Sequence, residues 1–137
     1  DSAHLTLDFY DGQTVSFTID TISKEEVLKH ADFISLHVPA QKEYVISTKE
    51  FGMMKKGAGI VNAARGGVID EVALVKAIED GIISNAALDV FESEPAPEIQ
   101  LLMNKNISLT PHIGAATLEA QDRIGEELAA QIIAYSA

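Results

Sequence analysis

Val61-Asn62-Ala63-Ala64-Arg65-Gly66-Gly67-Val68-Ile69-Asp70 is the stretch that decides the fold of this chain. An apolar run that begins at Ala58 leads into it, and two glycines separate its arginine from a helix start at Asp70. The pattern predicts a buried strand that opens into a turn where the backbone passes close to another group. In open α/β sheets, ligands bind at the carboxyl ends of the strands, so this turn is the first candidate site.

Arg65 is the residue of this turn that can bind an anion, because its planar guanidinium fits a carboxylate with parallel hydrogen bonds. The alternative is an arginine that bonds only to local carbonyl groups. Two later apolar strands favour the interpretation that Arg65 binds a ligand. Residues 87–95 end in acidic side chains, and residues 109–117 end in Pro-His and small residues. Since the carboxyl ends of parallel strands meet at one edge, an arginine, a carboxylate and a histidine are expected to lie together there.

Four motifs in register resemble the cofactor domain of the D-isomer-specific 2-hydroxyacid dehydrogenases. They are S-L-H-V-P at 35–39, N-A-A-R-G-G-x-I-D at 62–70, L-D-V-F-E-x-E-P at 88–95 and L-T-P-H-I-G-A-A-T at 109–117. The likeness extends from residue 31 to about residue 135, and the helix opening at 116–121 is most similar to the D-3-phosphoglycerate dehydrogenase branch. The resemblance implies an oxidoreductase that acts on a CH–OH group with NAD.

The three catalytic candidates are Arg65, Glu94 and His112, and the resemblance gives them the roles that their chemistry suggests. His112 suits the general base, because histidine titrates near neutrality. Glu94 would hold the far ring nitrogen and favour the imidazolium. Arg65 would bind the substrate carboxylate and polarise the carbonyl of the 2-oxo acid. The alternative without a catalytic role is that Glu94 or its neighbour Glu92 is a solvent-exposed acid in a loop.

The resemblance also implies a set of cofactor contacts, and no metal site is expected. Small side chains along the cofactor would allow close backbone approach, and Asp89 would lie near the nicotinamide. Without the family, Pro39 is a strand terminator and Asp89 a strand-end cap. The predicted cofactor-binding residues are Val38, Pro39, Ala63, Ala64, Arg65, Asp89, His112, Ile113, Gly114 and Ala115.

Composition limits the classes of function. The 137 residues are enough for one domain with a real core. A formal net charge of −11 argues against nucleic-acid binding, which depends on cationic contacts to phosphate. With no cysteine, disulfides and thiolate metal sites are excluded. No apolar run reaches the roughly 18 residues of a membrane span, and no signal peptide is visible, so a cytoplasmic protein is expected.

The order of elements predicts an α/β fold with a partial, Rossmann-type doubly wound parallel sheet. Two alternating runs around Asp11-Gly12 predict an N-terminal β-hairpin over 4–19, a departure from the family. Strands are expected at 32–39, 58–61, 86–90 and 107–109, and helices at 23–30, 47–54, 70–78, near 99–102 and at 116–135.

The first strand of such a sheet and its G-x-G-x-x-G turn are not among these residues. Gly57-Ala58-Gly59-Ile60-Val61-Asn62 starts like that turn, but it ends in asparagine and precedes a strand. Residues 1–137 are therefore expected to be the C-terminal part of a dinucleotide-binding domain, without the substrate domain. In the family an acid after the second strand holds the adenosine ribose, and Asp1 and Asp11 are the two candidates.

Two classes of function remain open. The first is a fragment of an NAD-dependent dehydrogenase, with 3-phosphoglycerate (serine biosynthesis) as the leading substrate and D-glycerate, glyoxylate, hydroxypyruvate or D-lactate as alternatives. The second is an NAD(H)-sensing regulatory module like the corepressors that share this fold. The fragment alone is expected to be inactive and to bind NAD weakly or not at all, because a phosphate loop is lacking. The whole protein is expected to be a homodimer, and the choice of NAD or NADP stays open.

Overall fold

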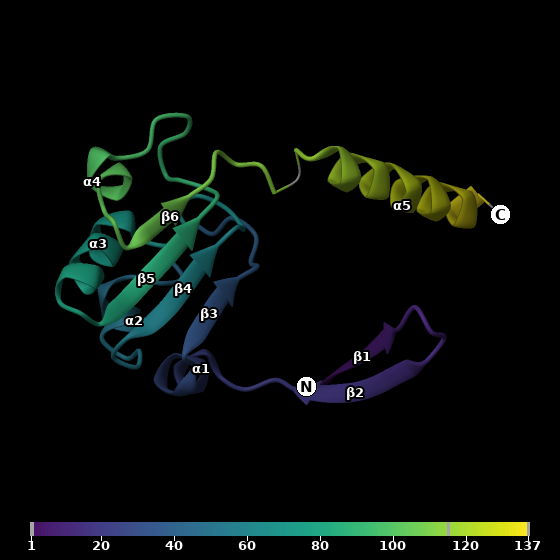
Figure 1. The fold of residues 1–137 in the computed structure, drawn as a ribbon, viewed down its shortest axis with the longest axis horizontal. Coiled ribbons are helices and arrows are strands. Elements are labelled where there is room, and N and C mark those ends of the chain that lie inside the picture. The colour runs from purple at the N-terminus through teal and green to yellow at the C-terminus, as the bar shows by residue number, and fades with distance from the viewer. Residues whose placement is uncertain (1, 115, 137) are drawn as a thin grey trace.

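The computed structural model describes residues 2–114 and 116–136, which contain two separate sheets. Strands β1 (Ser2–Asp8) and β2 (Thr14–Asp20) pair antiparallel as a hairpin. Four parallel strands form the main sheet in the order β3-β4-β5-β6 (Figure 1). They are β3 (Phe33–Leu36), β4 (Ala58–Asn62), β5 (Ile83–Leu88) and β6 (Ile107–Leu109). The predicted α/β class, parallel sheet and N-terminal hairpin are confirmed.

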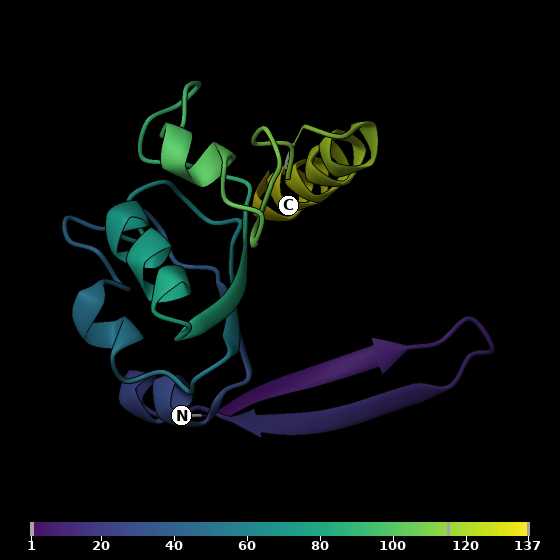
Figure 2. The same ribbon diagram turned by 60° about the vertical axis from the view of Figure 1, so that its left-hand side comes forward.

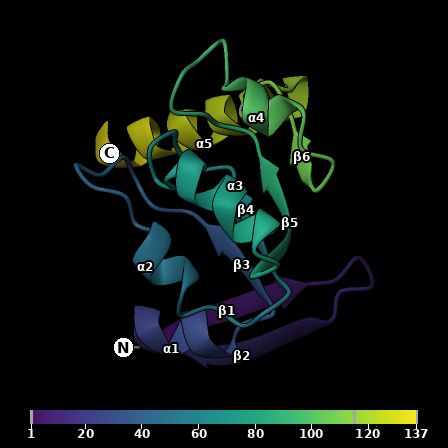
Figure 3. The ribbon, with the colours of Figure 1, turned by 90° about the vertical axis from the view of Figure 1, so that its left-hand side faces the viewer.

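Four helices cover one face of the main sheet, and the fifth lies apart from it (Figures 1 and 2). The covering helices are α1 (Lys24–His30), α2 (Thr48–Phe51), α3 (Glu71–Glu79) and α4 (Ile99–Leu102). Figure 3 shows α1, α2 and α3 in front of the strands, with α5 (Leu118–Ser136) behind them. In the described part of the chain, then, packed helices lie on one face of the sheet only.

The helix starts follow the capping signals in the sequence. Ser23 accepts a hydrogen bond from the N–H of Glu26, whose carboxylate accepts one from the N–H of Ser23, and α1 starts there. Asp70 accepts from the N–H of Ala73 at 2.9 Å and begins α3. These bonds satisfy donors that a helix N-terminus leaves open, so short polar side chains fix the positions of both helices.

The core lies between the sheet and its covering helices. Ile34, Leu36, Ile60 and Leu88 point to the helices and are at most 7% exposed. Alternate residues point to the other face, where Phe33 is 78% exposed. Strand β3 alternates strictly between exposed and buried residues, whereas β4 begins with three buried residues in a row and β5 is irregular. Within the described residues, the face of the main sheet under the helices is the packed one.

Several boundaries differ from those predicted. Strand β3 ends at Leu36 rather than Pro39, and β5 spans Ile83–Leu88 rather than 86–90. The apolar run alone does not mark where ladder pairing stops, since buried Val90 continues the run past the last paired residue of β5. The second short helix also ends earlier, at Phe51, although Met54 still packs into the core as predicted.

Two elements expose their apolar sides. In the hairpin, Leu7 and Phe9 are about half exposed, and in α5 no residue is buried. In α4, Leu101 is buried, whereas Ile99 is 66% exposed. No helix in the described ranges is long and apolar enough to cross a membrane.

The burial difference predicts a difference in stability between two matched isoleucine variants. Ile60→Ala should lower the free energy of unfolding by about 2–5 kcal/mol, because it leaves a cavity in the core. Ile99→Ala should change it by no more than about 0.5 kcal/mol. Urea denaturation of both variants measures this, and equal losses would contradict the described core.

Candidate functional site

The turn after β4 is shaped by a buried asparagine. Asn62 is 2% exposed, and its side-chain oxygen accepts a hydrogen bond from the N–H of Ala64 at 3.1 Å. Its side-chain nitrogen donates to the carbonyl of Arg65 at 3.0 Å. Asparagine side chains often bond to backbone two or three residues ahead and so form a turn without a glycine. Asn62 therefore fixes the direction in which Arg65 leaves the sheet.

Gly66 lets this turn contact the loop after β5. A Cβ atom at position 66 would overlap the carbonyl oxygen of Phe91 and lie 2.5 Å from its carbonyl carbon. The next residue, Gly67, has φ +74°, a conformation that side chains disfavour. The predicted close approach of backbone is thus present, and the group approached is the chain itself at Phe91.

Asp89 joins β5 to the turn that follows β6. It is 8% exposed and accepts hydrogen bonds from the hydroxyl of Thr110 at 2.5 Å and from the N–H groups of Ile113 and Gly114 at 2.9 Å each. Burial alone would raise the pKa of this carboxyl, but the three donors outweigh burial and hold the pKa below its ordinary value. Asp89 is therefore a charged anchor for the segment that carries His112.

Glu94 and His112 form a carboxylate–histidine pair. The Nδ1 atom of His112 lies 2.8 Å from Oε2 of Glu94, and Oε1 of Glu94 accepts from the N–H of Phe91 at 3.0 Å. The hydrogen bond with His112, followed by that from Phe91, lowers the pKa of Glu94. His112 has φ +55°, a left-handed conformation that is uncommon outside glycine and that clusters at functional sites.

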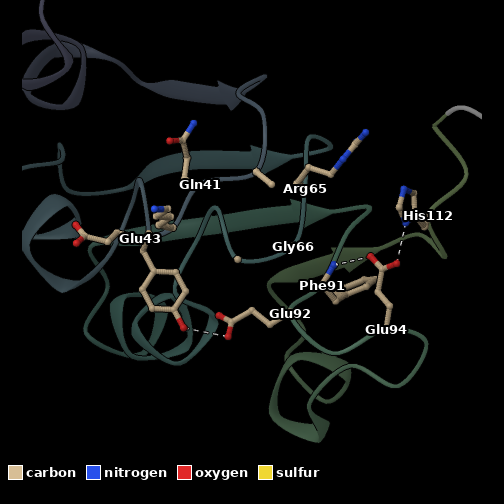
Figure 4. Close-up of a pocket in the computed structure, with 12 residues that line it drawn as sticks. Gln41, Glu43, Arg65, Gly66, Phe91, Glu92, Glu94 and His112 are labelled. Carbon is tan, nitrogen blue, oxygen red and sulfur yellow. Dashed lines mark hydrogen bonds and ion pairs between the residues drawn. The ribbon is translucent and has the colours of Figure 1, made fainter.

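Arg65, Glu94 and His112 all line one open cavity of about 870 Å³. In Figure 4, Arg65 and His112 extend to the same side, with Glu94 directed at the imidazole. Arg65 donates a hydrogen bond to the carbonyl of Ala64 at 2.6 Å. The alternative, an arginine that bonds to local carbonyl groups, therefore describes one of its contacts. No carboxylate among the described residues pairs with its guanidinium.

A second, narrower groove of about 340 Å³ adjoins this cavity. Ala40 and Arg65 line both the cavity and the groove, so the two are adjacent at these residues. The groove residues include five of the predicted cofactor contacts, Val38, Pro39, Ala63, Ala64 and Arg65. The other lining residues are His37 and Ala40, so small and apolar side chains make up most of the groove.

The other predicted cofactor residues lie elsewhere. The oxygens of Asp89 accept from the 110–114 turn, so the strand-end cap reading describes its observed contacts. Ile113 and Gly114 are exposed on that turn. Ala115 falls outside the described residues, as does Asp1, while the competing ribose candidate Asp11 accepts from the N–H of Gln13 within the hairpin turn.

Sequence reasoning missed one wall of the cavity. Residues 40–44 line it opposite the pair, and Tyr44 donates to Glu92 at 3.0 Å. It also missed the turn-forming role of Asn62. The segment 40–44 has neither periodicity nor a motif that could have indicated a site, whereas an asparagine directly after an apolar run is a usable turn signal.

Comparison with known proteins identifies the fold and the family. Residues 7–114 match the family described as D-isomer specific 2-hydroxyacid dehydrogenase, NAD binding domain. The chain belongs to this family. Among solved structures, a glyoxylate reductase from Paecilomyes thermophila shares 42% identity with a TM-score of 0.72, over 76% of this chain and 32% of that one. The predicted family is thus confirmed.

Relatives with different substrates are similar to nearly the same degree. D-3-phosphoglycerate dehydrogenase 3, chloroplastic, of Arabidopsis thaliana is 46% identical over 84% of this chain and 20% of its own length. Glyoxylate reductase of Thermococcus litoralis is 47% identical over 82% of this chain and 34% of its own. The chain thus spans about a fifth to a third of the curated relatives that it matches.

The contact at Gly66 predicts a cost for the smallest added side chain. Gly66→Ala should lower the free energy of unfolding by about 1–3 kcal/mol, since the methyl group meets the backbone of Phe91. Gly125→Ala in α5 is the matched control, because nothing lies within 4 Å of its added Cβ. The control should be neutral or stabilised by up to about 1 kcal/mol in urea denaturation. A loss in the control alone would contradict the described packing.

The anchor at Asp89 predicts a dependence of stability on pH. A carboxyl whose folded pKa is lowered contributes stability above its ordinary pKa of about 4 and loses it as the pH falls through the folded value. Unfolding midpoints of the unaltered chain should therefore fall steeply from about pH 5 downward. Asp89→Asn should be less stable at neutral pH and show a shallower acid slope. Identical slopes would exclude Asp89 as a source of the dependence.

Proposed function

We propose that this chain is the C-terminal part of the dinucleotide-binding domain of an NAD-dependent D-2-hydroxyacid dehydrogenase. One observation carries the proposal. A histidine held by a carboxylate lines the same cavity as an arginine that pairs with no carboxylate in residues 2–114 and 116–136. That set supplies the base and the anion-binding group that oxidation of a 2-hydroxy acid requires.

Each of the three residues has one role in the proposed reaction. The Nδ1–H of His112 donates to Glu94, so Nε2 accepts the proton of the substrate hydroxyl. Glu94 keeps the ring in this tautomer and favours the imidazolium that forms. Arg65 binds the carboxylate next to the reacting carbon. Val38, Pro39, Ala63 and Ala64 would contact the cofactor along the groove, and NAD, when bound, would supply the hydride acceptor.

For the substrate we propose 3-phosphoglycerate, and hence a place in serine biosynthesis. Similarity to D-3-phosphoglycerate dehydrogenases supports this choice. Glyoxylate is the runner-up, because a glyoxylate reductase is similar to the same degree. The homodimer, the cytoplasmic location and the roles of Asp89, Ile113, Gly114 and Ala115 at the cofactor stay predictions.

Turnover by the whole dehydrogenase that contains this chain tests the proposal. NAD reduction should be detected with a D-2-hydroxy acid from a panel that includes 3-phosphoglycerate. His112→Asn should reduce kcat/KM by about 10²–10⁴-fold, because the general base is lost. His30→Asn, at the exposed end of α1, is the matched control and should leave kcat/KM unchanged. Residues 1–137 alone should show no turnover.

The remaining outcomes separate the alternatives. Turnover on another acid would keep the mechanism and change the substrate. Absence of turnover on every acid, with NADH still bound tightly by the whole protein, would refute the enzyme and favour the regulatory module.

A further inference from the structure

We propose that Tyr44 is a positioning residue, which holds the 40–44 loop as the outer wall of the substrate cavity through its hydrogen bond to Glu92. The inference goes beyond the three catalytic residues and rests on the proposed function for its kinetic part. Tyr44 follows β3 in sequence and Glu92 follows β5, so the bond joins two loops that are 48 residues apart.

The first step is the fixed position of Glu92. Its Oε1 atom accepts from the N–H of Glu71 at 3.1 Å, and its own N–H donates to Oε1 of Glu71 at 2.7 Å. Glu71 is 5% exposed and lies in the first turn of α3. This reciprocal pair attaches Glu92 to the packed body of the domain, so the side chain is a rigid acceptor for a partner in a loop.

The second step is the difference between Glu92 and Glu94. Both carboxylates line the cavity, two residues apart, but they face different partners. Both oxygens of Glu92 accept hydrogen bonds, from Tyr44 and from α3, whereas Glu94 accepts from His112 and Phe91. Each carboxylate accepts one hydrogen bond at each oxygen, so the two acids differ in their partners: Glu92 supports the wall, and Glu94 serves the histidine.

The third step is the position of the wall. Gln41 and Glu43 lie across the cavity from Glu94 and His112, with Arg65 between the two sides (Figure 4). An acid whose carboxylate is bound by Arg65 would direct its remaining atoms to one of these sides. The hydrogen bond to Glu92, followed by the charge of Glu92, raises the pKa of Tyr44, so its hydroxyl keeps the proton that it donates.

Limited proteolysis tests the wall without any need for activity. Trypsin can cleave after Lys42, within the loop, and after Lys105, an exposed lysine in a loop on another side. Tyr44→Phe should speed cleavage after Lys42 by about two- to tenfold, the effect of one lost hydrogen bond, and leave Lys105 unchanged. Glu92→Ala removes the acceptor and should speed cleavage after Lys42 by at least as much. Adding Tyr44→Phe to Glu92→Ala should have no further effect, because the tyrosine acts through the glutamate. Unchanged cleavage at Lys42, or additive effects, would overturn the proposal.

Kinetics of the whole dehydrogenase test the positioning role. Tyr44→Phe should raise KM for the 2-oxo acid by a similar factor, with kcat and KM for NADH unchanged. Tyr10→Phe, in the exposed hairpin turn, is the matched control and should change nothing. A change in kcat or in KM for NADH, instead of KM for the acid, would overturn the role. If the unaltered protein turns over no acid, the proposed function fails, and cleavage at Lys42 still decides whether the wall is held.

Discussion

The site depends on one buried carboxylate. Asp89 directly follows β5, an inner strand of the main sheet, and accepts from three donors of the segment after β6, which places His112 beside the loop that carries Glu94. The other supports of this segment are the three-residue strand β6, the hydrogen bond from the N–H of Thr110 to Leu88 and the pair of His112 with Glu94. A charged acceptor with three donors is among the stronger polar contacts available to a protein, and it tolerates burial because every donor is aimed at it. The position of His112 thus depends on the main sheet, through Asp89.

Local signals in the sequence were sufficient to predict helix starts, the hairpin turn and the common location of Arg65, Glu94 and His112. Ser23 and Asp70 begin helices where their side chains predict, and Asp11-Gly12 forms the hairpin turn. Arg65 and His112 line the same cavity because the carboxyl ends of parallel strands lie at one edge of the sheet. These features depend on a few neighbouring residues or on a simple rule of topology.

Features that depend on contacts between distant loops could not be predicted. Nothing in the neighbourhood of Tyr44 indicates a partner 48 residues away, and nothing near Glu92 separates it from Glu94. Strand ends were misplaced for a similar reason, since ladder pairing depends on the neighbouring strand as well as on apolar character. Helix α5 carries apolar residues such as Ile124, Leu128 and Ile132, yet none of its described residues is buried.

The spacing of the two acids after β5 has a consequence for how this loop can change during evolution. Glu92 and Glu94 are separated by one exposed residue, Ser93, and this single step sends one carboxylate to the cavity wall and the other to the histidine. Ser93 itself tolerates replacement, because it is exposed to solvent. The number of residues between Glu92 and Glu94 is constrained, because an insertion or deletion there would exchange or misdirect the two acids. At this position the spacing matters more than the identity of the residue.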